Sequence, residues 1–300
     1  MSISIQFDEY GSPQVLRAVE EILPEPDEGQ VRLANRAISV NPVDWKIVAG
    51  HLSAFVPLEL PAVPGNESAG VIEAVGPGVD EFAVGDEVIW SGFAGGYRQQ
   101  ANVPAAQLVK KPAGIDFEQA ASLPVAAGTA YSMLTQVDVG PDDVVLVHAA
   151  AGGVGSAAVQ IATARGARVI GTASESNHDY LRSLGAEPVT YGEGLADRVK
   201  ALGTITASVD AVGGAESAAA TAALLPDLGR AVTAVSDEHA AAAGIARVES
   251  LKDRVAATAE LAAAGKLVFA IAERLPLGDA IKALELSYTG HVRGKIVLVP

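Results

Sequence analysis

The first part of the chain alternates apolar and polar residues in short segments separated by turn signals. Four segments are predicted to be strands: Gln30–Val40, Ser68–Val75, Asp86–Trp90 and Gly95–Val103. Apolar residues at every second position are typical of strands that bury one face. Gly76-Pro77-Gly78 is typical of a tight reversal between two of them. The pattern predicts an antiparallel β-rich domain over residues 1–117.

After Phe117, short and wholly apolar runs alternate with longer runs of helical spacing. The predicted strands are Val144–His148, Arg168–Thr172, Ala207–Ala211 and Ala231–Val235. The predicted helices are Ser122–Leu134, Gly153–Arg165, Asn177–Leu184, Ala215–Leu225 and Val248–Ala264. Such an alternation is typical of a parallel sheet that helices cover on both faces. The tail is predicted to form a strand (Lys266–Ala272), a helix (Gly278–Ser287) and an apolar last strand (Arg293–Val299), which needs a partner.

The turn after the strand Val144–His148 reads Ala149-Ala150-Ala151-Gly152-Gly153-Val154-Gly155. A buried strand enters it, an alanine-rich helix leaves it, and a second strand ends about twenty residues later, as in a dinucleotide-binding fingerprint. Ala150, Gly152 and Gly155 take the three glycine positions of that motif. Gly152 would let the backbone approach a pyrophosphate, and Gly155 would let the helix pack close to the strand. Together with Gly153 and Val154, they are our candidate diphosphate site.

The end of the second strand distinguishes the two nicotinamide cofactors. An acidic residue there binds the ribose of NAD, whereas this strand ends in Ala173-Ser174, with no carboxylate to repel a 2′-phosphate. Ser174, His178 and Tyr191 are therefore candidate cofactor residues, and NADP(H) is the expected cofactor. Glu175, one position further on, could turn inward and bind the ribose of NAD, so NADH stays open as the alternative cofactor.

Composition excludes several classes of function. Acidic residues number 36 against 21 basic ones, which gives a formal charge of −15. That charge repels nucleic acids and anionic membranes. The chain has no cysteine, so a disulfide, a thiolate nucleophile and a cysteine-ligated metal are excluded. We expect a cytoplasmic protein without a signal peptide or a membrane span.

Several stretches resemble one family in the same order along the chain. They are Asn41-Pro42-Val43-Asp44-Trp45-Lys46, Pro64-Gly65-Asn66-Glu67-Ser68-Ala69-Gly70, Gly76-Pro77-Gly78-Val79, Gly85-Asp86-Glu87-Val88, Ser122-Leu123-Pro124, the 149–155 turn, Asp210-Ala211-Val212-Gly213-Gly214 and Arg293-Gly294-Lys295-Ile296-Val297-Leu298. Over nearly its full length, the chain resembles the zinc-independent, quinone oxidoreductase-like branch of the medium-chain dehydrogenase/reductase superfamily.

The resemblance implies an α/β fold in which a Rossmann doubly wound parallel sheet, over residues 118–264, is inserted in a GroES-like β-rich domain. That domain would consist of residues 1–117 and be completed by residues 265–300, which would give the last strand its partner. Zinc-dependent relatives carry Gly-His-Glu where this chain has Gly65-Asn66-Glu67. Asn66 therefore replaces a metal ligand, and we expect no zinc.

The resemblance also implies catalytic roles. Asn41 would donate a hydrogen bond to an acceptor oxygen, and Thr129 would hold the nicotinamide carboxamide. Lys46, where related quinone reductases often have tyrosine, would bind the ribose or supply a proton, or be only a surface lysine. Val212 is a further cofactor candidate.

Three further polar residues have a structural interpretation beside a functional one. Asp44 would cap the helix that begins beside it. His51 and Tyr97 would be structural or line the cleft.

The expected activity is NADPH-dependent reduction of quinones or α,β-unsaturated carbonyls by a homodimer. Hydride addition to such acceptors gives a delocalised anion that hydrogen-bond donors can stabilise without a metal. An enoyl-thioester reductase and a non-catalytic NADP(H)-binding regulatory or structural protein stay open as alternatives. The natural acceptor and the proton donor are not determined by the sequence.

Overall fold

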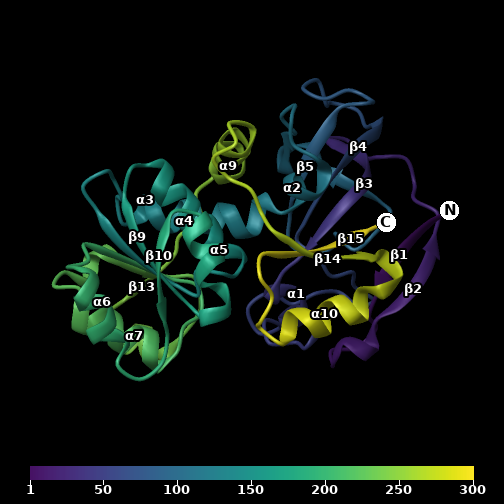
Figure 1. The fold of residues 1–300 in the computed structure, drawn as a ribbon. Helices are drawn as coiled ribbons and strands as arrows, with labels where there is room; N and C mark the ends of the chain where they lie inside the picture. Colours follow the sequence, from purple (N-terminus) through teal and green to yellow (C-terminus); the bar gives the residue numbers. More distant parts are fainter. The chain divides into compact units, whose positions relative to one another are not determined.

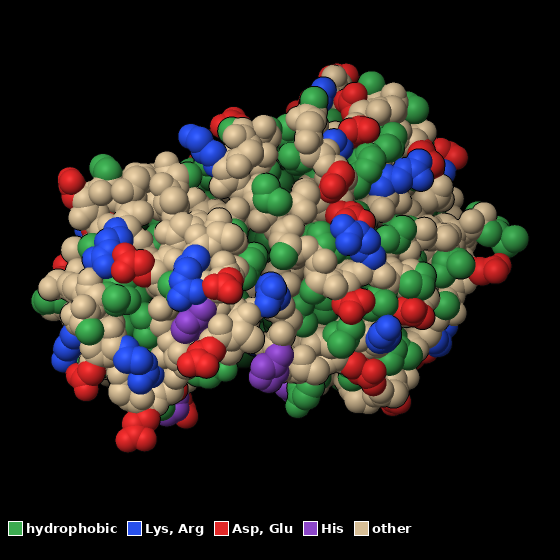
Figure 2. Space-filling model, in the orientation of Figure 1, with side chains coloured by type: hydrophobic (Ala, Val, Ile, Leu, Met, Phe, Trp, Pro, Cys, Tyr) green, Lys and Arg blue, Asp and Glu red, His purple; other side chains and the backbone are tan.

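The computed structural model describes all 300 residues and divides into two compact units (Figure 1). The first unit comprises Met1–Val125 and Ala270–Pro300, and the second comprises Ala126–Phe269. The first unit extends past residue 117 because helix α2 (Phe117–Ala121) packs on three of its strands. No helix is long and apolar enough to cross a membrane. Figure 2 shows acidic and basic side chains interspersed over the visible face.

The second unit is a six-stranded parallel sheet with strand order β10-β9-β8-β11-β12-β13. Its strands are β8 (Val144–His148), β9 (Arg168–Ala173), β10 (Ala186–Thr190), β11 (Ala207–Asp210), β12 (Ala231–Thr233) and β13 (Ala246–Arg247). Because β8 to β11 are largely buried and rich in β-branched residues, they need cover on both faces. This order and connectivity are those of a Rossmann-like doubly wound sheet.

Two groups of helices provide that cover, with the sheet between them (Figure 1). Helices α3, α4 and α9 pack together in one group, and α6, α7 and α8 in the other, whereas α5 packs on β10. Their bounds are α3 (Gly128–Gln136), α4 (Gly153–Ala164), α5 (His178–Ser183), α6 (Leu195–Leu202), α7 (Ala215–Leu224), α8 (Glu238–Ala242) and α9 (Arg254–Ala263). The α/β class that the apolar pattern predicts is confirmed.

The first unit is a mixed, β-rich domain around the long central strand β3 (Gln30–Val40). Its other strands are β1 (Ser2–Gln6), β2 (Arg17–Glu21), β4 (Glu67–Val75), β5 (Glu87–Ser91), β6 (Gln100–Pro104), β7 (Leu108–Lys110), β14 (Ile271–Pro276) and β15 (Lys295–Val299). Helices α1 (Pro42–Val48) and α10 (Ala280–Tyr288) pack on each other. The last strand, β15, pairs antiparallel with β3, so the C-terminal segment completes this unit.

Two predicted helices begin later than the sequence pattern suggests. Ser122 is not a helix N-cap: it is the C-cap residue of α2, and its hydroxyl donates to Glu118 O in the first turn of that helix. A π-helical turn (Leu123–Ala127) that contains Pro124 then leads into α3. Residues 248–253 are not helical: Glu249 N donates to Gln136 Oε1 and Leu251 N to Ser132 Oγ, which ties the segment to α3.

The tail strand is also displaced from its predicted position. It begins at Ile271 instead of Lys266, because Lys266 N caps α9 through Leu261 O and Val268 N donates to Gln160 Oε1 on α4. These backbone groups are therefore used before the strand starts.

Candidate functional site

The glycine-rich turn of the second unit lies between β8 and α4, at the carboxyl end of the central strand. Ala149 adopts a left-handed conformation (φ +53°), and its N–H donates to Thr172 Oγ1 at 3.1 Å. Ala150 N donates to Thr172 O at 2.9 Å, so both residues are tied to the neighbouring strand β9. Ala150 is fully buried, and a Cβ added at Gly171 would lie 2.8 Å from its methyl group. A larger side chain at 150 has no room.

Two glycines of this turn have different physical reasons to be glycine. At Gly155, an added Cβ would lie 2.1 Å from Ala149 O and 2.7 Å from Ala150 Cα, so close packing of helix on turn requires it. Gly152 is extended (φ −76°, ψ −179°), and the nearest atom to its added Cβ is Ala149 O at 3.5 Å. Neither conformation nor packing requires glycine there. The missing side chain leaves room at the N terminus of α4 for a ligand to approach the backbone.

The N terminus of α4 is a suitable place for a diphosphate. Gly152 is its N-cap residue and has no side chain to cap the helix, and the first turn contains no acidic residue. The N–H groups of Gly153, Val154 and Gly155 find no backbone acceptor, since the first helical bond runs from Ser156 N to Gly152 O. Unpaired amides and the helix dipole together favour an anion. The residues present therefore fit a bound dinucleotide.

The remaining cofactor candidates follow the ends of neighbouring strands at the same edge of the sheet. Ser174 follows β9, and its hydroxyl lies 3.0 Å from Ser176 Oγ and accepts from Asn177 Nδ2. His178 begins α5, with Nε2 3.4 Å from Thr190 Oγ1. Tyr191 and Val212, which follow β10 and β11, are both more than half exposed. Glu175, the rival residue for NADH, is exposed in the turn after Ser174.

Asp210 and Arg198 shape the loops that carry two of these candidates, and the sequence pattern predicts neither role. Asp210, at the end of β11, accepts hydrogen bonds from Val212 N, Gly213 N and Ser217 Oγ. The guanidinium of Arg198 donates to carbonyl oxygens from Thr190 to Glu193, including that of Tyr191. Each loop is therefore held by one buried or bridging side chain from its own unit.

A buried polar network in the first unit joins three segments that are far apart in the sequence. Asn41 follows β3, Glu67 begins β4 and Lys295 begins β15; none is more than 5% exposed. Lys295 Nζ donates to Asn41 Oδ1 at 2.6 Å, Glu67 Oε1 at 3.1 Å and Val40 O at 3.2 Å. Asn41 Nδ2 donates to Glu67 Oε1 at 2.7 Å. The second carboxylate oxygen of Glu67 accepts from Val125 N at 2.6 Å, in the π-helical turn.

A second branch of the network surrounds Asp44. This carboxyl group accepts from Asn41 N at 2.9 Å, so Asp44 does cap α1, and also from Tyr97 Oη at 3.0 Å and Asn66 Nδ2 at 3.2 Å. Burial raises the pKa of Asp44 to about 7, although the donors from Asn41 and Tyr97 oppose the rise. Burial, together with the neighbouring Asp44 carboxylate, also raises the pKa of Tyr97 well above its usual value. Tyr97 is fully buried and therefore has a structural position.

Lys46 lies on α1, beside the aromatic ring of Trp45. Its Nζ is 5.5 Å from the ring centroid of Trp45 and forms no ion pair. The Trp45 ring makes edge-to-face contacts with Tyr288 (centroids 5.0 Å apart) and with His51 (5.6 Å). Tyr288 and His51 are exposed. Trp45 of α1, His51 just after that helix and Tyr288 at the end of α10 thus form an aromatic cluster, Trp45-His51-Tyr288. The ammonium group of Lys46 lies beside it.

The predicted site residues are divided between the two units. Asn41 and Lys46 belong to the first, and Thr129 and the candidate nucleotide-binding residues to the second. Thr129 is half-buried near the start of α3, and its hydroxyl makes no hydrogen bond within the protein. Glu67 and Lys295 belong to two of the family-like stretches, but the sequence predicted no role for either residue. The available signal for them was a charged residue at the start of an otherwise apolar strand.

The donor atoms around Asn66 do not fit a zinc ion. Its Oδ1 accepts from Ala94 N at 2.7 Å and its Nδ2 donates to Asp44, so both ends of the amide are used. The neighbouring Glu67 is already neutralised by the ammonium of Lys295. No group of three or more His, Cys, Asp or Glu side chains is placed to hold a metal ion. Thiolate and imidazole, the usual zinc ligands, have no counterpart at this position.

Two family models match the chain, one in each unit. Residues 27–113 match the alcohol dehydrogenase GroES-like domain, and residues 153–254 match the zinc-binding dehydrogenase model. The second name mentions zinc, but the matched residues belong to the parallel sheet and its helices, where no group of three or more His, Cys, Asp or Glu side chains is placed to hold a metal ion.

Solved structures of the same architecture cover the whole chain. The quinone oxidoreductase from Coxiella burnetii is 31% identical, with a TM-score of 0.88 and 100% of both chains covered. The Escherichia coli quinone oxidoreductase complexed with NADPH is 28% identical (TM-score 0.86, covering 99% of this chain and 100% of that one). An NAD-dependent alcohol dehydrogenase is 30% identical (TM-score 0.90, 99% of both chains).

Among curated proteins, the chain is 37% identical over 205 residues to quinone oxidoreductase 1 of Escherichia coli (strain K12). That match covers 67% of this chain and 62% of the relative, which is less than two thirds of its length. Together, the sheet topology, the glycine turn and these similarities define a member of the medium-chain dehydrogenase/reductase superfamily. The chain belongs to the quinone oxidoreductase-like branch of that superfamily.

Proposed function

We propose that this protein is a zinc-independent reductase that uses NADPH to reduce quinones or α,β-unsaturated carbonyl compounds. The observation that carries the proposal is the combination of an open glycine turn at Gly152 with an amide, Asn66, where related enzymes hold zinc. When bound, the nicotinamide supplies the hydride. The protein must then bind the acceptor, exclude water and stabilise the anion that forms on it.

The cofactor preference is proposed from the end of β9. Ser174 offers a hydroxyl there, and the exposed position of Glu175 lets its carboxylate stay in solvent, away from a 2′-phosphate. The Escherichia coli relative was solved with NADPH, which supports the same choice. The NAD-dependent relative keeps NADH as the competitor. A substitution that places a carboxylate at 174 should reverse the preference.

The proposed roles of three side chains follow from their partners. One amide hydrogen of Asn41 is used by Glu67, and the other has only a 3.5 Å contact with Ser39 O, so it is the one left for an acceptor oxygen. Thr129 has an unused hydroxyl for the nicotinamide carboxamide. Lys46 holds a proton at Nζ without any ion-pair partner, and we assign it the ribose contact or the proton supply.

The aromatic cluster Trp45-His51-Tyr288 favours a planar acceptor over an enoyl-thioester. Aromatic rings pack edge-to-face or offset on one another, and a quinone or an aryl enone offers such a planar surface. Within the cluster, Trp45 lies on α1 together with Lys46, and this helix begins next to Asn41. His51 follows the helix, and Tyr288 ends α10. An enoyl-thioester chain has no comparable ring for these side chains to contact.

The test is consumption of NADPH and of NADH by the purified protein, in parallel, with simple quinones, aryl enones, alkyl enones and crotonyl thioesters. We expect turnover with quinones and aryl enones, faster with NADPH, and no loss of activity after treatment with a zinc chelator. The Ser174→Asp variant should shift the preference toward NADH, while Ser183→Asp, at an exposed serine that ends α5, serves as the matched control. Absence of oxidation with every acceptor, despite tight NADPH binding, would support the non-catalytic alternative.

We also propose that the protein is a homodimer, as the family resemblance implies. Light scattering coupled to size-exclusion chromatography tests this directly, because a monomer has a mass of 30.5 kDa. A measured mass of 30.5 kDa at every concentration tested would contradict the homodimer proposal.

A further inference from the structure

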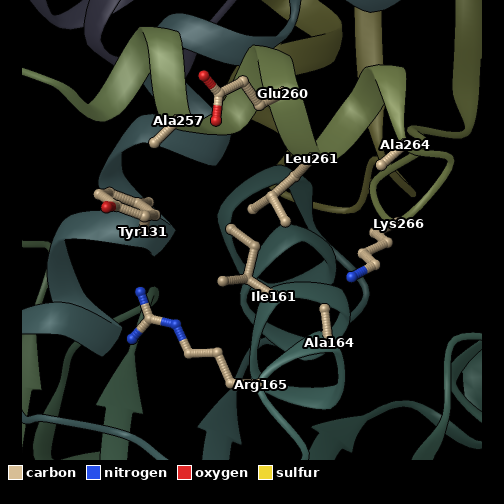
Figure 3. Close-up of a pocket in the computed structure, with 9 residues that line it drawn as sticks. All are labelled: Tyr131, Ile161, Ala164, Arg165, Ala257, Glu260, Leu261, Ala264 and Lys266. Carbon is tan, nitrogen blue, oxygen red and sulfur yellow. The ribbon is translucent and has the colours of Figure 1, made fainter.

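A groove of about 320 Å³ lies in the second unit between α3, α4 and α9 (Figure 3). It is lined near the C-terminal end of α4, whereas the nucleotide-binding turn is at the N-terminal end of the same helix. Eleven residue steps at 1.5 Å place the two ends roughly 17 Å apart. The groove is therefore not the dinucleotide site, and neither the cofactor nor the acceptor accounts for it.

The floor of the groove is apolar and its rim is charged. Ile161 and Leu261 meet in the middle, with alanines beside them, while Tyr131, Arg165, Glu260 and Lys266 stand around the edge (Figure 3). Lys266 and Glu260 form no salt bridge with each other or with any other residue, and neither side chain makes a hydrogen bond. An apolar floor with a few polar groups at the rim is typical of small-molecule sites, and this volume is at the small end of their range.

Arg165 is held in place in a way that leaves donors for a ligand. Its Nη2 donates to Thr135 Oγ1 at 2.7 Å, and its guanidinium lies 5.4 Å from the ring centroid of Tyr131. Nε and Nη1 make no hydrogen bond within the protein. A guanidinium fixed by two contacts loses little freedom on binding, and its remaining N–H groups suit a carboxylate. Partial burial lowers the pKa of Arg165, so its charge is incompletely solvated and gains from an incoming anion.

We propose that this groove binds a small monocarboxylate with an apolar body, whose carboxylate pairs with Arg165 and whose hydrocarbon part covers Leu261 and the alanines beside it, above the buried Ile161. The rim carries two cations, Arg165 and Lys266, and one carboxylate, Glu260, so its net positive charge favours a negatively charged ligand. The unpaired Glu260 disfavours ligands with several negative charges, such as phosphate esters. The apolar floor excludes small hydrophilic anions as tight ligands, because they would leave it exposed.

The probes are hexanoate, acetate, hexylamine and hexanol, added to the full-length protein and followed by shifts in methyl-region NMR spectra. Hexanoate should perturb the Ile161 and Leu261 methyl groups and bind at least about tenfold more tightly than acetate, because burial of its longer chain adds to affinity. Hexylamine should not bind at this site. Equal shifts with hexanol or hexylamine would overturn the proposal, since the charge of the ligand would then be irrelevant.

Arg165→Met removes the guanidinium and should weaken hexanoate binding by at least about tenfold. Arg247→Met removes an exposed arginine elsewhere in the same unit, with the same change in net charge, and should leave binding unchanged. Arg165→Gln also removes the charge and gives a second variant if Arg165→Met does not fold. Unchanged hexanoate affinity in either folded Arg165 variant contradicts the proposal.

A competition experiment separates this site from the proposed cofactor site. NADPH should bind with the same affinity at saturating hexanoate. If hexanoate displaces NADPH, the carboxylate occupies the nucleotide turn and the assignment to this groove is wrong. The proposal does not depend on the reductase activity, so a protein without turnover would still be expected to bind hexanoate.

Discussion

Replacement of Lys295 by methionine tests the buried network in the first unit most directly. Lys295 is 3% exposed and its partner Glu67 is 0% exposed, so methionine fills a similar volume but leaves the Glu67 carboxylate without its counter-charge. It also leaves Val40 O and Asn41 Oδ1 without the donor that they share. Loss of one partner of a buried ion pair costs about 3–5 kcal/mol. That is a large fraction of the stability of an ordinary domain.

The assay is urea unfolding followed by tryptophan fluorescence. The chain has two tryptophans, Trp45 and Trp90, and both lie in the first unit, so the signal reports the unit that carries the substitution. The matched control is Lys110→Met, which breaks an ion pair with Asp86 whose lysine side chain is 64% exposed. Such a surface pair contributes about 0.2–1 kcal/mol. The two lysines should therefore differ several-fold in their effect on the free energy of unfolding.

A double variant completes the experiment. Adding Glu67→Gln to Lys295→Met removes the unpaired buried charge, and we expect it to recover about 1–3 kcal/mol of the loss. A Lys295→Met variant that costs under about 1 kcal/mol, or a double variant no more stable than the single one, would refute this account. In that case the carboxylate of Glu67 would have to be solvated or protonated without Lys295.

Three further predictions concern the turn, the acid and the aromatic cluster. Gly152→Ala should leave the melting temperature nearly unchanged but weaken NADPH binding at least about tenfold in a fluorescence titration. Gly155→Ala should lower both the melting temperature and the affinity for NADPH, because its Cβ would lie 2.1 Å from Ala149 O. Equal loss of stability in the two variants would contradict this reading of the turn. Because the folded-state pKa of Asp44 is raised to about 7, its contribution to stability is full below its unfolded pKa near 4 and is lost as pH rises through about 7. Asp44→Asn should flatten that decline in unfolding free energies measured across this window, and an unchanged slope would assign it to other groups. Trp45→Leu should raise KM for naphthoquinone severalfold more than KM for an alkyl enone, and equal changes in steady-state kinetics would exclude stacking of the acceptor on this ring.

Much of the nucleotide-binding unit follows from the sequence because its signals are local. The strand β8 and the turn after it need only the apolar run Val144–Val147 and small residues at 150, 152 and 155, all within a dozen positions. Strand β3 has the predicted bounds, Gln30–Val40, for the same reason: its pattern depends on neighbours one and two residues away. The absence of cysteine and the asparagine at 66 are also properties of the sequence alone.

Other features depend on distant side chains, and only the tertiary structure decided them. The helix predicted from Val248 begins at Arg254 because Gln136 and Ser132 of α3 bind the intervening backbone. The same is true of the network around Lys295, whose partners Asn41 and Glu67 are 254 and 228 positions away in the chain.

No local pattern indicates which carboxylate a buried lysine will meet. The tertiary structure determines the partner, because a charged group removed from water is tolerated only where the fold places an opposite charge and enough hydrogen-bond donors next to it. The sequence by itself determined the class of fold and the place of the glycine-rich turn. The pairing of strands β3, β4 and β15 decided which polar residues share one buried site.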